Sequence, residues 1–237
     1  MRLLALAVLL PALTAVAHGP KSKPPKGGHE PAGSIAGKVL VKDAEGKHGA
    51  EAAVVYVDSV DPALWESDER RARLKPEQRM ITMKAKRFVP RVLAVVSGED
   101  VSFPNLDPVY HNAFSLSGKN KFDLGLYKDG KSKTQAFKQP GIARVFCNIH
   151  PAMTAYVVVL QNPWFVKVGP EGTYKLAGVP PGSYTLSVWS EKGKAAKTVE
   201  VRAGASTSQD FEVDASGFKE IPHKNKFSKD YEKSDSY

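Results

Sequence analysis

Cysteine is nearly absent from this sequence, since Cys147 is the one cysteine among 237 residues. A single cysteine cannot form a disulfide within the chain, although exported proteins usually pair their cysteines. Cys147 is therefore a free thiol, a link to another chain or a metal ligand. Long apolar runs are also lacking: the apolar stretch at 3–16 is shorter than the roughly 20 residues that a membrane-spanning helix needs.

The first residues have the pattern of an export signal. A short basic start, Met1-Arg2, precedes the apolar stretch at 3–16, and Ala15-Val16-Ala17 fits the small-x-small pattern of a signal-peptidase site. We therefore expect residues 1–17 to be a signal peptide. The protein that begins at His18 is expected to be exported, most simply into the periplasm.

Lysine gives the chain its charge, because 34 Lys and Arg side chains face 25 Asp and Glu side chains for a net charge of +9. The lysine blocks are not interleaved with aromatic residues as in nucleic-acid-binding motifs, so we expect no nucleic-acid partner. Two interpretations stay open. The lysines are a solvated surface that keeps the protein soluble, or they steer the protein toward an acidic partner.

A helical period is missing between residues 80 and 160. Short stretches of alternating apolar and polar residues occur there instead, separated by turn residues, and similar stretches occur at 33–58 and 162–214. Many short strands with turn signals predict an all-β sandwich or barrel. Three segments fall outside the predicted strands: a flexible linker at 18–32, a charged excursion at 59–79 and a charged, disordered tail at 215–237.

The stretch FCNIHPAM places Cys147, His150 and Met153 at a spacing of C-x2-H-x2-M between two predicted strands. Two imidazoles, one thiolate and a weak axial thioether are the ligands of a blue copper site, because this mixture suits both Cu(I) and Cu(II). The missing second imidazole is expected upstream, on the end of a neighbouring strand. His111 has that position.

Other interpretations of Cys147 were weighed against copper. A lone cysteine on a strand is usually a small core residue. Zinc is a second alternative, although methionine is a poor zinc ligand. A catalytic pair with His111 or His150 as the base is a third. The chain has no H-x-H pair of the kind that catalytic copper centres use, which favours a one-electron carrier over an enzyme.

The motifs of residues 80–161 resemble those of the cupredoxins, the family of plastocyanin, pseudoazurin and amicyanin. The matching stretches are Gly98-Glu-Asp-Val-Ser-Phe-Pro-Asn105, Asp107, His111-Asn112, Pro140-Gly141 and Cys147-x2-His150-x2-Met153. The short ligand loop, with Pro151 directly after His150, is most similar to amicyanin.

The resemblance implies a cupredoxin Greek-key sandwich that holds one type 1 copper ion. The implied equatorial ligands are His111, Cys147 and His150, with Met153 as the axial ligand. Around them, the resemblance implies supporting roles for Asn112, whose side chain would tie two loops together, and for Phe146 and Pro151.

The rest of the chain resembles a carboxypeptidase regulatory-like (transthyretin-like) β-sandwich in two pieces, at 33–58 and 162–214. The segment between the pieces is the cupredoxin-like block. Either that block is inserted into the second sandwich, or two domains follow one another and 33–58 supplies the first cupredoxin strands. Neither piece alone has enough strands for a stable sheet, which motivates the inserted arrangement.

These observations predict an exported type 1 copper protein that carries single electrons between redox partners and is not an enzyme. Two alternatives remain. A copper delivery or storage protein would need exposed, exchangeable ligands, and a surface- or partner-binding β-sandwich protein would keep its function without Cys147.

Overall fold

The structure is a computed structural model that describes residues 30–46, 49, 52–65, 79–220 and 222–231. Apart from the short 3-10 helices η1 (Pro62–Leu64) and η3 (Gly118–Asn120), the regular elements described are β-strands. The prediction of an all-β protein is therefore confirmed. The expected signal peptide, most of the expected linker and residues 66–78 of the expected excursion lie outside the described residues.

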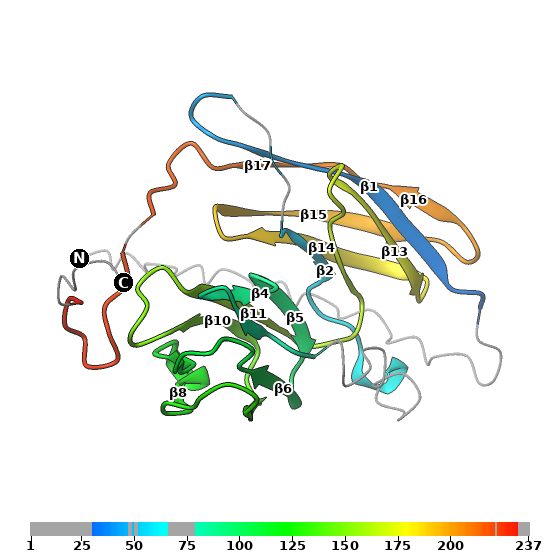
Figure 1. The fold of residues 1–237 in the computed structure, drawn as a ribbon. Coiled ribbons are helices and arrows are strands. Elements are labelled where there is room, and N and C mark those ends of the chain that lie inside the picture. Colours follow the sequence, from blue (N-terminus) through cyan, green and yellow to red (C-terminus); the bar gives the residue numbers. More distant parts are fainter. Residues whose placement is uncertain (1–29, 47–48, 50–51, 66–78, 221, 232–237) are drawn as a thin grey trace, which may run out of the picture.

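One group of strands, here called the outer sandwich, comes from both ends of the described chain (Figure 1). Its strands are β1 (Gly33–Lys42), β2 (Val54–Val57), β12 (Phe165–Lys167), β13 (Thr173–Val179), β14 (Gly182–Ser190), β15 (Gly193–Val201), β16 (Ser206–Ser208) and β17 (Phe211–Asp214). They form two sheets, one ordered β13-β1-β16 with β17 also paired to β1, and one ordered β12-β2-β14-β15. Alternate side chains of both sheets meet in a buried core that includes Ile35, Val55, Leu186 and Val213.

The second group of strands, here called the inserted unit, lies between β2 and β12 in the sequence. Its strands are β3 (Thr82–Lys84), β4 (Arg87–Val89), β5 (Val92–Val96), β6 (Glu99–Pro104), β7 (Phe114–Ser115), β8 (Phe122–Asp123), β9 (Ser132–Phe137), β10 (Gly141–Phe146) and β11 (Thr154–Leu160). A five-stranded sheet is ordered β5-β11-β10-β7-β8, with two-stranded sheets β3-β4 and β6-β9 beside it. Cys147 and Met153 lie in its core with Phe103, Phe137 and Val157.

The strand pairing distinguishes the two arrangements that the sequence left open. β1 pairs with β13 in the register Ile35↔Leu176, and β2 pairs with β14 in the register Val57↔Leu186. Strands β1 and β2, from residues 33–57, therefore belong to the same sheets as the strands that follow residue 164. This pairing is that of the inserted arrangement, in which the chain leaves the outer sandwich after β2 and returns to it at β12.

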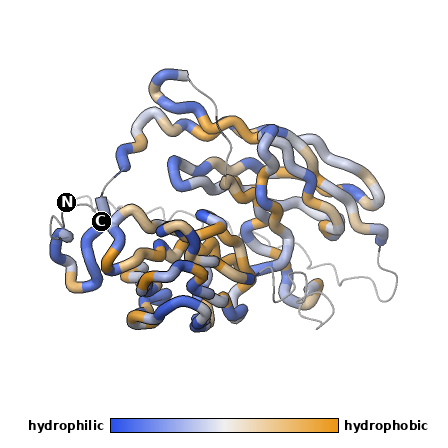
Figure 2. Tube along the Cα trace, viewed as in Figure 1, coloured by the Kyte–Doolittle hydropathy of each residue, from blue (hydrophilic) through white to orange (hydrophobic). Residues whose placement is uncertain are grey.

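Strand β11 connects the cores of the two units. Ala155, Val157 and Val159 point into the core of the inserted unit, while Tyr156 and Val158 point into a second cluster with Trp189 of β14. The Tyr156 and Trp189 ring centroids are 5.4 Å apart. Because both faces of β11 are covered, its sequence is a nearly continuous apolar run, and apolar residues gather along the strands of this region in Figure 2.

The segment after β17 differs from the disordered tail predicted for 215–237. Residues 222–231 form no strand, yet they bond to the inserted unit: the Lys226 amide donates to Asn148 Oδ1 at 2.9 Å, and the Tyr231 hydroxyl donates to the Cys147 carbonyl at 2.8 Å. Polar composition predicts disorder when too little apolar surface can be buried. Here, hydrogen bonds to the turn between β10 and β11 and one aromatic contact anchor the segment instead. Figure 1 shows it descending from β17 toward the inserted unit.

The close approach of β1 to the chain between β16 and β17 gives a test of the outer sandwich. A Cβ atom at Gly37 would lie 1.9 Å from the carbonyl oxygen of Gln209. We expect Gly37→Ala to lower the free energy of unfolding by about 2–3 kcal/mol, because backbone atoms must move apart. Chemical denaturation followed by tryptophan fluorescence measures this change.

Gly49→Ala is the matched control, because a Cβ atom there meets no atom within 4 Å. We expect that variant to change the free energy of unfolding by less than about 0.5 kcal/mol. Equal stability of the two variants would contradict the observed packing of β1.

Candidate metal centre

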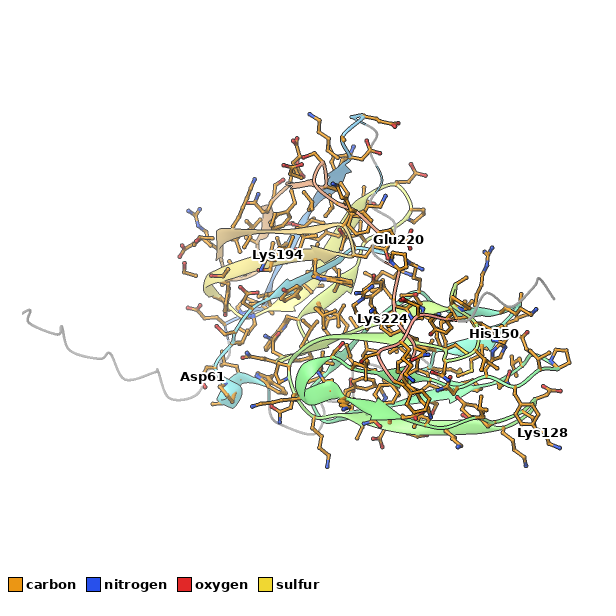
Figure 3. All side chains as sticks on the ribbon, turned by 90° about the vertical axis from the view of Figure 1, so that its left-hand side faces the viewer. Asp61, Lys128, His150, Lys194, Glu220 and Lys224 are labelled. Carbon is orange, nitrogen blue, oxygen red and sulfur yellow. The ribbon has the colours of Figure 1, made fainter. Side chains whose placement is uncertain are left out.

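The side chains of His111, Cys147 and His150 meet at one end of the inserted unit. Cys147 Sγ lies 3.8 Å from His111 Nδ1 and 3.6 Å from His150 Nδ1, and the three donor atoms lie within 4.8 Å of one another. His111 and Cys147 are completely buried, whereas His150 is partly exposed. Figure 3 labels His150 near the edge of the molecule. Two imidazole nitrogens and one sulfur are thus gathered around a single point.

The turn between β10 and β11, here called the ligand loop (residues 147–153), fixes two of these donors. The last residue pair of the hairpin is Phe146↔Thr154, so the loop begins and ends on paired strands. Inside it, the Cys147 amide donates to the Met153 carbonyl at 3.3 Å, and the Met153 amide donates to the His150 carbonyl at 3.0 Å. The residues of the C-x2-H-x2-M motif therefore form a closed turn, in which Cys147 and His150 lie close together.

Met153 ends the ligand loop and is completely buried. Its side chain packs in the same apolar cluster as Cys147. The structure thus places the predicted axial residue in the same apolar core as the Cys147 thiol. The three donors that it gathers within 4.8 Å are the histidines and the cysteine.

His111 is held from a different part of the chain. Its amide donates to the Tyr127 carbonyl at 3.1 Å, and its carbonyl accepts from the Tyr127 amide at 2.9 Å. Its Nε2 atom lies 2.8 Å from Asp107 Oδ2. A carboxylate only accepts, so Nε2 carries the proton and Nδ1 presents its lone pair toward Cys147 Sγ.

Asp107 was part of the motif, but sequence reasoning assigned it no role. In the structure, its carboxylate also accepts from the amides of Ala85 at 2.6 Å and Lys86 at 2.8 Å. Both donors lie in the β3–β4 turn with φ of +53°, a conformation that aims their N–H groups at one acceptor. Burial opposes the charge, but the hydrogen bonds from Lys86, His111 and Ala85 outweigh it and lower the pKa of Asp107. The group is thus a fixed anion behind His111.

Asn112 joins the segment of His111 to the ligand loop. Its Oδ1 atom accepts from the Asn148 amide at 2.6 Å, and its Nδ2 atom donates to Asp123 Oδ1 at 3.3 Å. Its own backbone N–H, together with those of Ile149 and His150, faces the Cys147 sulfur and acts to lower the pKa of that thiol. Asn112 therefore both ties the two segments together and helps to surround the sulfur with N–H donors.

Burial shifts the pKa values of the two loop donors in opposite directions. Burial raises the pKa of Cys147, partly offset by the backbone N–H groups that face its sulfur, so the metal-free thiol keeps its proton at neutral pH. Burial, with a smaller effect of the Lys86 charge, lowers the pKa of His150, so its imidazole is neutral. A neutral imidazole can bind a metal directly, and metal binding at Cys147 displaces one proton.

Phe146 and Pro151 flank the donors on the chain. Phe146 is buried between Phe114, at a centroid distance of 5.8 Å, and the His223 ring, at 4.0 Å. The Pro151 carbonyl accepts from His223 Nε2 at 2.7 Å. Sequence reasoning singled out Phe146 and Pro151 but missed His223, because nothing in its local sequence links it to a loop 72 residues earlier.

The donor set fits copper by its chemistry. A thiolate and a thioether are soft donors that suit Cu(I), and imidazole suits both oxidation states. A structural zinc site prefers four strong ligands, mostly thiolates and imidazoles. Among the described residues, the gathered set consists of two imidazoles and one thiol. The other soft donor, the Met153 thioether, is buried in the same apolar cluster as the thiol.

Comparison with known proteins found no matching family model and no matching curated protein. Solved structures with partial likeness include a purple cupredoxin from Nitrosopumilus maritimus, 24% identical, with 34% of this chain and 97% of that chain covered and a TM-score of 0.31. The Cu(I) form of an amicyanin mutant is 20% identical over 38% of this chain and 88% of that one, with a TM-score of 0.33.

A Cu-containing nitrite reductase from Thermus scotoductus SA-01 is 26% identical, with a TM-score of 0.34. The alignment covers 43% of this chain but 27% of the reductase, so this chain corresponds to a minor part of that protein. Each likeness covers less than half of this chain, and the functional argument below rests on the geometry of the donors.

Asp107→Asn tests the orientation of His111. An amide can turn its NH2 group toward Nε2, which would move the ring proton to Nδ1 and direct it at the metal position. We expect the affinity for copper to fall about 10- to 100-fold, as is typical when a partner of a metal-binding histidine is lost. Competition with a chelator of known affinity measures the change.

The control for this prediction is Asp129→Asn, which removes an equal charge from an exposed position. Its copper affinity should equal that of the unmodified protein. An unchanged affinity in Asp107→Asn would contradict the assigned role of Asp107.

Proposed function

We propose that this chain binds one copper ion in a type 1 site and carries single electrons between redox partners outside the cytoplasm. The observation that supports it is the meeting of His111, Cys147 and His150 around one point, with Met153 buried in the same apolar cluster as Cys147. His111, Cys147 and His150 would be the equatorial ligands and Met153 the axial one. The bound copper supplies reversible one-electron chemistry.

The protein's part in this function is to hold the donors still. His111 is fixed by Asp107 and by the Tyr127 backbone, and the ligand loop is closed by its own backbone hydrogen bonds. Donors that cannot move present a similar environment to both oxidation states, so little rearrangement accompanies the arrival or loss of an electron. Rigidity of this kind serves electron transfer.

A carrier fits the site better than an enzyme. His111 and Cys147 are completely buried, so a substrate would have no direct access to a metal held between them. Catalytic metal sites keep one coordination position open for water or substrate. Here, a fourth candidate donor, Met153, is buried in the same apolar cluster as Cys147.

The partly exposed His150 is the edge at which electrons would enter and leave. The neighbouring Ile149 is an apolar side chain with 44% of its surface exposed. An apolar, weakly hydrated surface allows a partner to approach the metal closely. The net charge of +9 would steer this approach toward acidic partners.

A delivery or storage function is less well supported, because exchange needs exposed ligands and this donor set is largely buried. The outer sandwich would act as a binding or spacing unit, as the sequence resemblance to carboxypeptidase regulatory-like domains implies. Export rests on the signal-like residues 1–17 and is tested by the N-terminal sequence of the protein isolated from the periplasm.

Cys147→Ser tests the type 1 site itself. The purified, copper-loaded protein should show an intense thiolate-to-copper absorption band and a narrow copper hyperfine splitting in its EPR spectrum. We expect both to disappear in the variant, because a serine hydroxyl does not replace a thiolate as a ligand. A spectrum unchanged by the substitution, or a colourless protein that prefers zinc, would refute the proposal.

Ile149→Lys tests the exchange of electrons at the His150 edge. We expect the rate of electron self-exchange to fall at least about 10-fold at low ionic strength, because two like charges then meet at the contact. Added salt should restore part of the rate, and the absorption band should stay in place. NMR line broadening in mixtures of the two oxidation states measures this rate.

Leu40→Lys is the matched control, since Leu40 is 42% exposed on β1 of the outer sandwich. Its self-exchange rate should remain near that of the unmodified protein. Equal rates in both variants would show that exchange does not pass through the His150 edge.

A further inference from the structure

The last described residues, 222–231, form a segment that we call the C-terminal strap. After β17 the chain leaves the outer sandwich and reaches the ligand loop of the inserted unit. In Figure 3 the segment that carries Lys224 crosses the strands of the inserted unit, with His150 to one side of it. His150 stays partly exposed in the presence of the strap.

Two side chains of the strap bond to backbone carbonyls of the ligand loop. The Tyr231 hydroxyl donates to the Cys147 carbonyl at 2.8 Å, and His223 Nε2 donates to the Pro151 carbonyl at 2.7 Å. His223 Nδ1 lies 3.2 Å from the Tyr231 hydroxyl, so the two side chains also contact each other.

The His223 ring also covers the residue before the metal-binding cysteine. It stacks on Phe146 with a centroid distance of 4.0 Å and an interplanar angle of 22°. Phe146 keeps only 7% of its surface exposed. The contact removes apolar surface from water and holds the end of β10, from which Cys147 follows.

A third strap residue, Lys226, closes a ring of hydrogen bonds around the two ligand-bearing segments. Its amide donates to Asn148 Oδ1 at 2.9 Å, and its Nζ atom pairs with Asp123 Oδ2 at 2.7 Å. The Asn148 amide donates to Asn112 Oδ1 at 2.6 Å, and Asn112 Nδ2 donates to Asp123 Oδ1 at 3.3 Å. The ring thus passes through the neighbours of His111 and Cys147 and returns to the strap.

We propose that the C-terminal strap is a positioning element, in which His223, Lys226 and Tyr231 hold the ligand loop in its metal-binding geometry. This inference rests on the proposed copper site. None of the three side chains replaces a ligand. They act through the carbonyls of Cys147 and Pro151 and through the side chains of Asn148 and Asp123.

The geometry separates two supports of the site. Asp107 and Asn112 hold the donors from within the inserted unit, whereas the strap holds the loop from a segment that arrives after the outer sandwich is complete. Inner supports fix the direction in which the donors point. An outer support limits how far the loop can open, and hence how fast a bound metal escapes.

Point variants of the full chain test the strap. We expect Tyr231→Phe and His223→Ala to speed the loss of Cu(I) to an excess of bicinchoninate at least about 10-fold. The reduction potential should move to more negative values, because a looser loop lets Cu(II) approach the tetragonal geometry that it prefers. Lys226→Ala should act in the same direction, and Lys226→Arg, which keeps the ion pair, should restore the original rate.

Lys224→Ala is the matched control in the same segment, since its side chain pairs only loosely with exposed Asp230, at 3.9 Å. Its rate of copper loss and its potential should equal those of the unmodified protein. A purely structural role of the strap would lower thermal stability without moving the potential. Copper loss and potential unchanged in both Tyr231→Phe and His223→Ala would overturn the inference.

A second readout separates this inference from the copper proposal. In the metal-free protein, the same variants should speed amide hydrogen exchange across residues 146–153, and Lys224→Ala should not. If the unmodified protein shows no thiolate-to-copper band, the copper proposal fails while exchange still decides whether the strap holds the loop. Unchanged exchange in Tyr231→Phe and His223→Ala would reject the strap in either case.

Discussion

The hydrogen bond between the Asn148 amide and the Asn112 side chain, at 2.6 Å, joins the two segments that carry the metal donors. His111 and Cys147 come from places far apart in the sequence, so their approach has to be maintained by contacts outside the donors themselves. Asn112 supplies that contact with one side-chain oxygen, while its backbone N–H faces the Cys147 sulfur. The strap is anchored on this junction, because Lys226 bonds to Asn148 and to Asp123, the partner of Asn112.

The strands behind the junction give it a firm base. β11 leaves the ligand loop at Thr154 and is covered on one face by the core of the inserted unit and on the other by a cluster with Trp189 of the outer sandwich. A strand buried on both faces cannot shift register without exposing apolar side chains. The outer sandwich thereby stabilises the hairpin that carries the loop, even though it contributes none of the gathered donors.

Charge is placed around the site so that the donors are ready for a metal. Asp107 is a fixed anion behind His111, held by three hydrogen bonds, and it keeps the ring proton on Nε2. Cys147 keeps its proton until a metal displaces it, because burial disfavours the free thiolate. Asp123 forms its ion pair with Lys226 near the surface, where the strap meets the segment of Asn112. One aspartate, Asp107, thus orients His111, and another, Asp123, anchors the strap.

The sequence by itself determined the class of fold and pointed to the three side chains that the structure gathers at one point. Short alternating stretches specify strands. C-x2-H-x2-M is a local pattern whose donors are close in any tight turn. His111 was chosen because the local pattern lacked the second imidazole of a blue copper site. Tertiary structure alone decided the pairing of β1 with β13, the role of Asp107 and the docking of Tyr231 on the Cys147 carbonyl. These depend on contacts between residues distant in the sequence, whose energies come from complementary surfaces and directed hydrogen bonds, and neither composition nor periodicity records them.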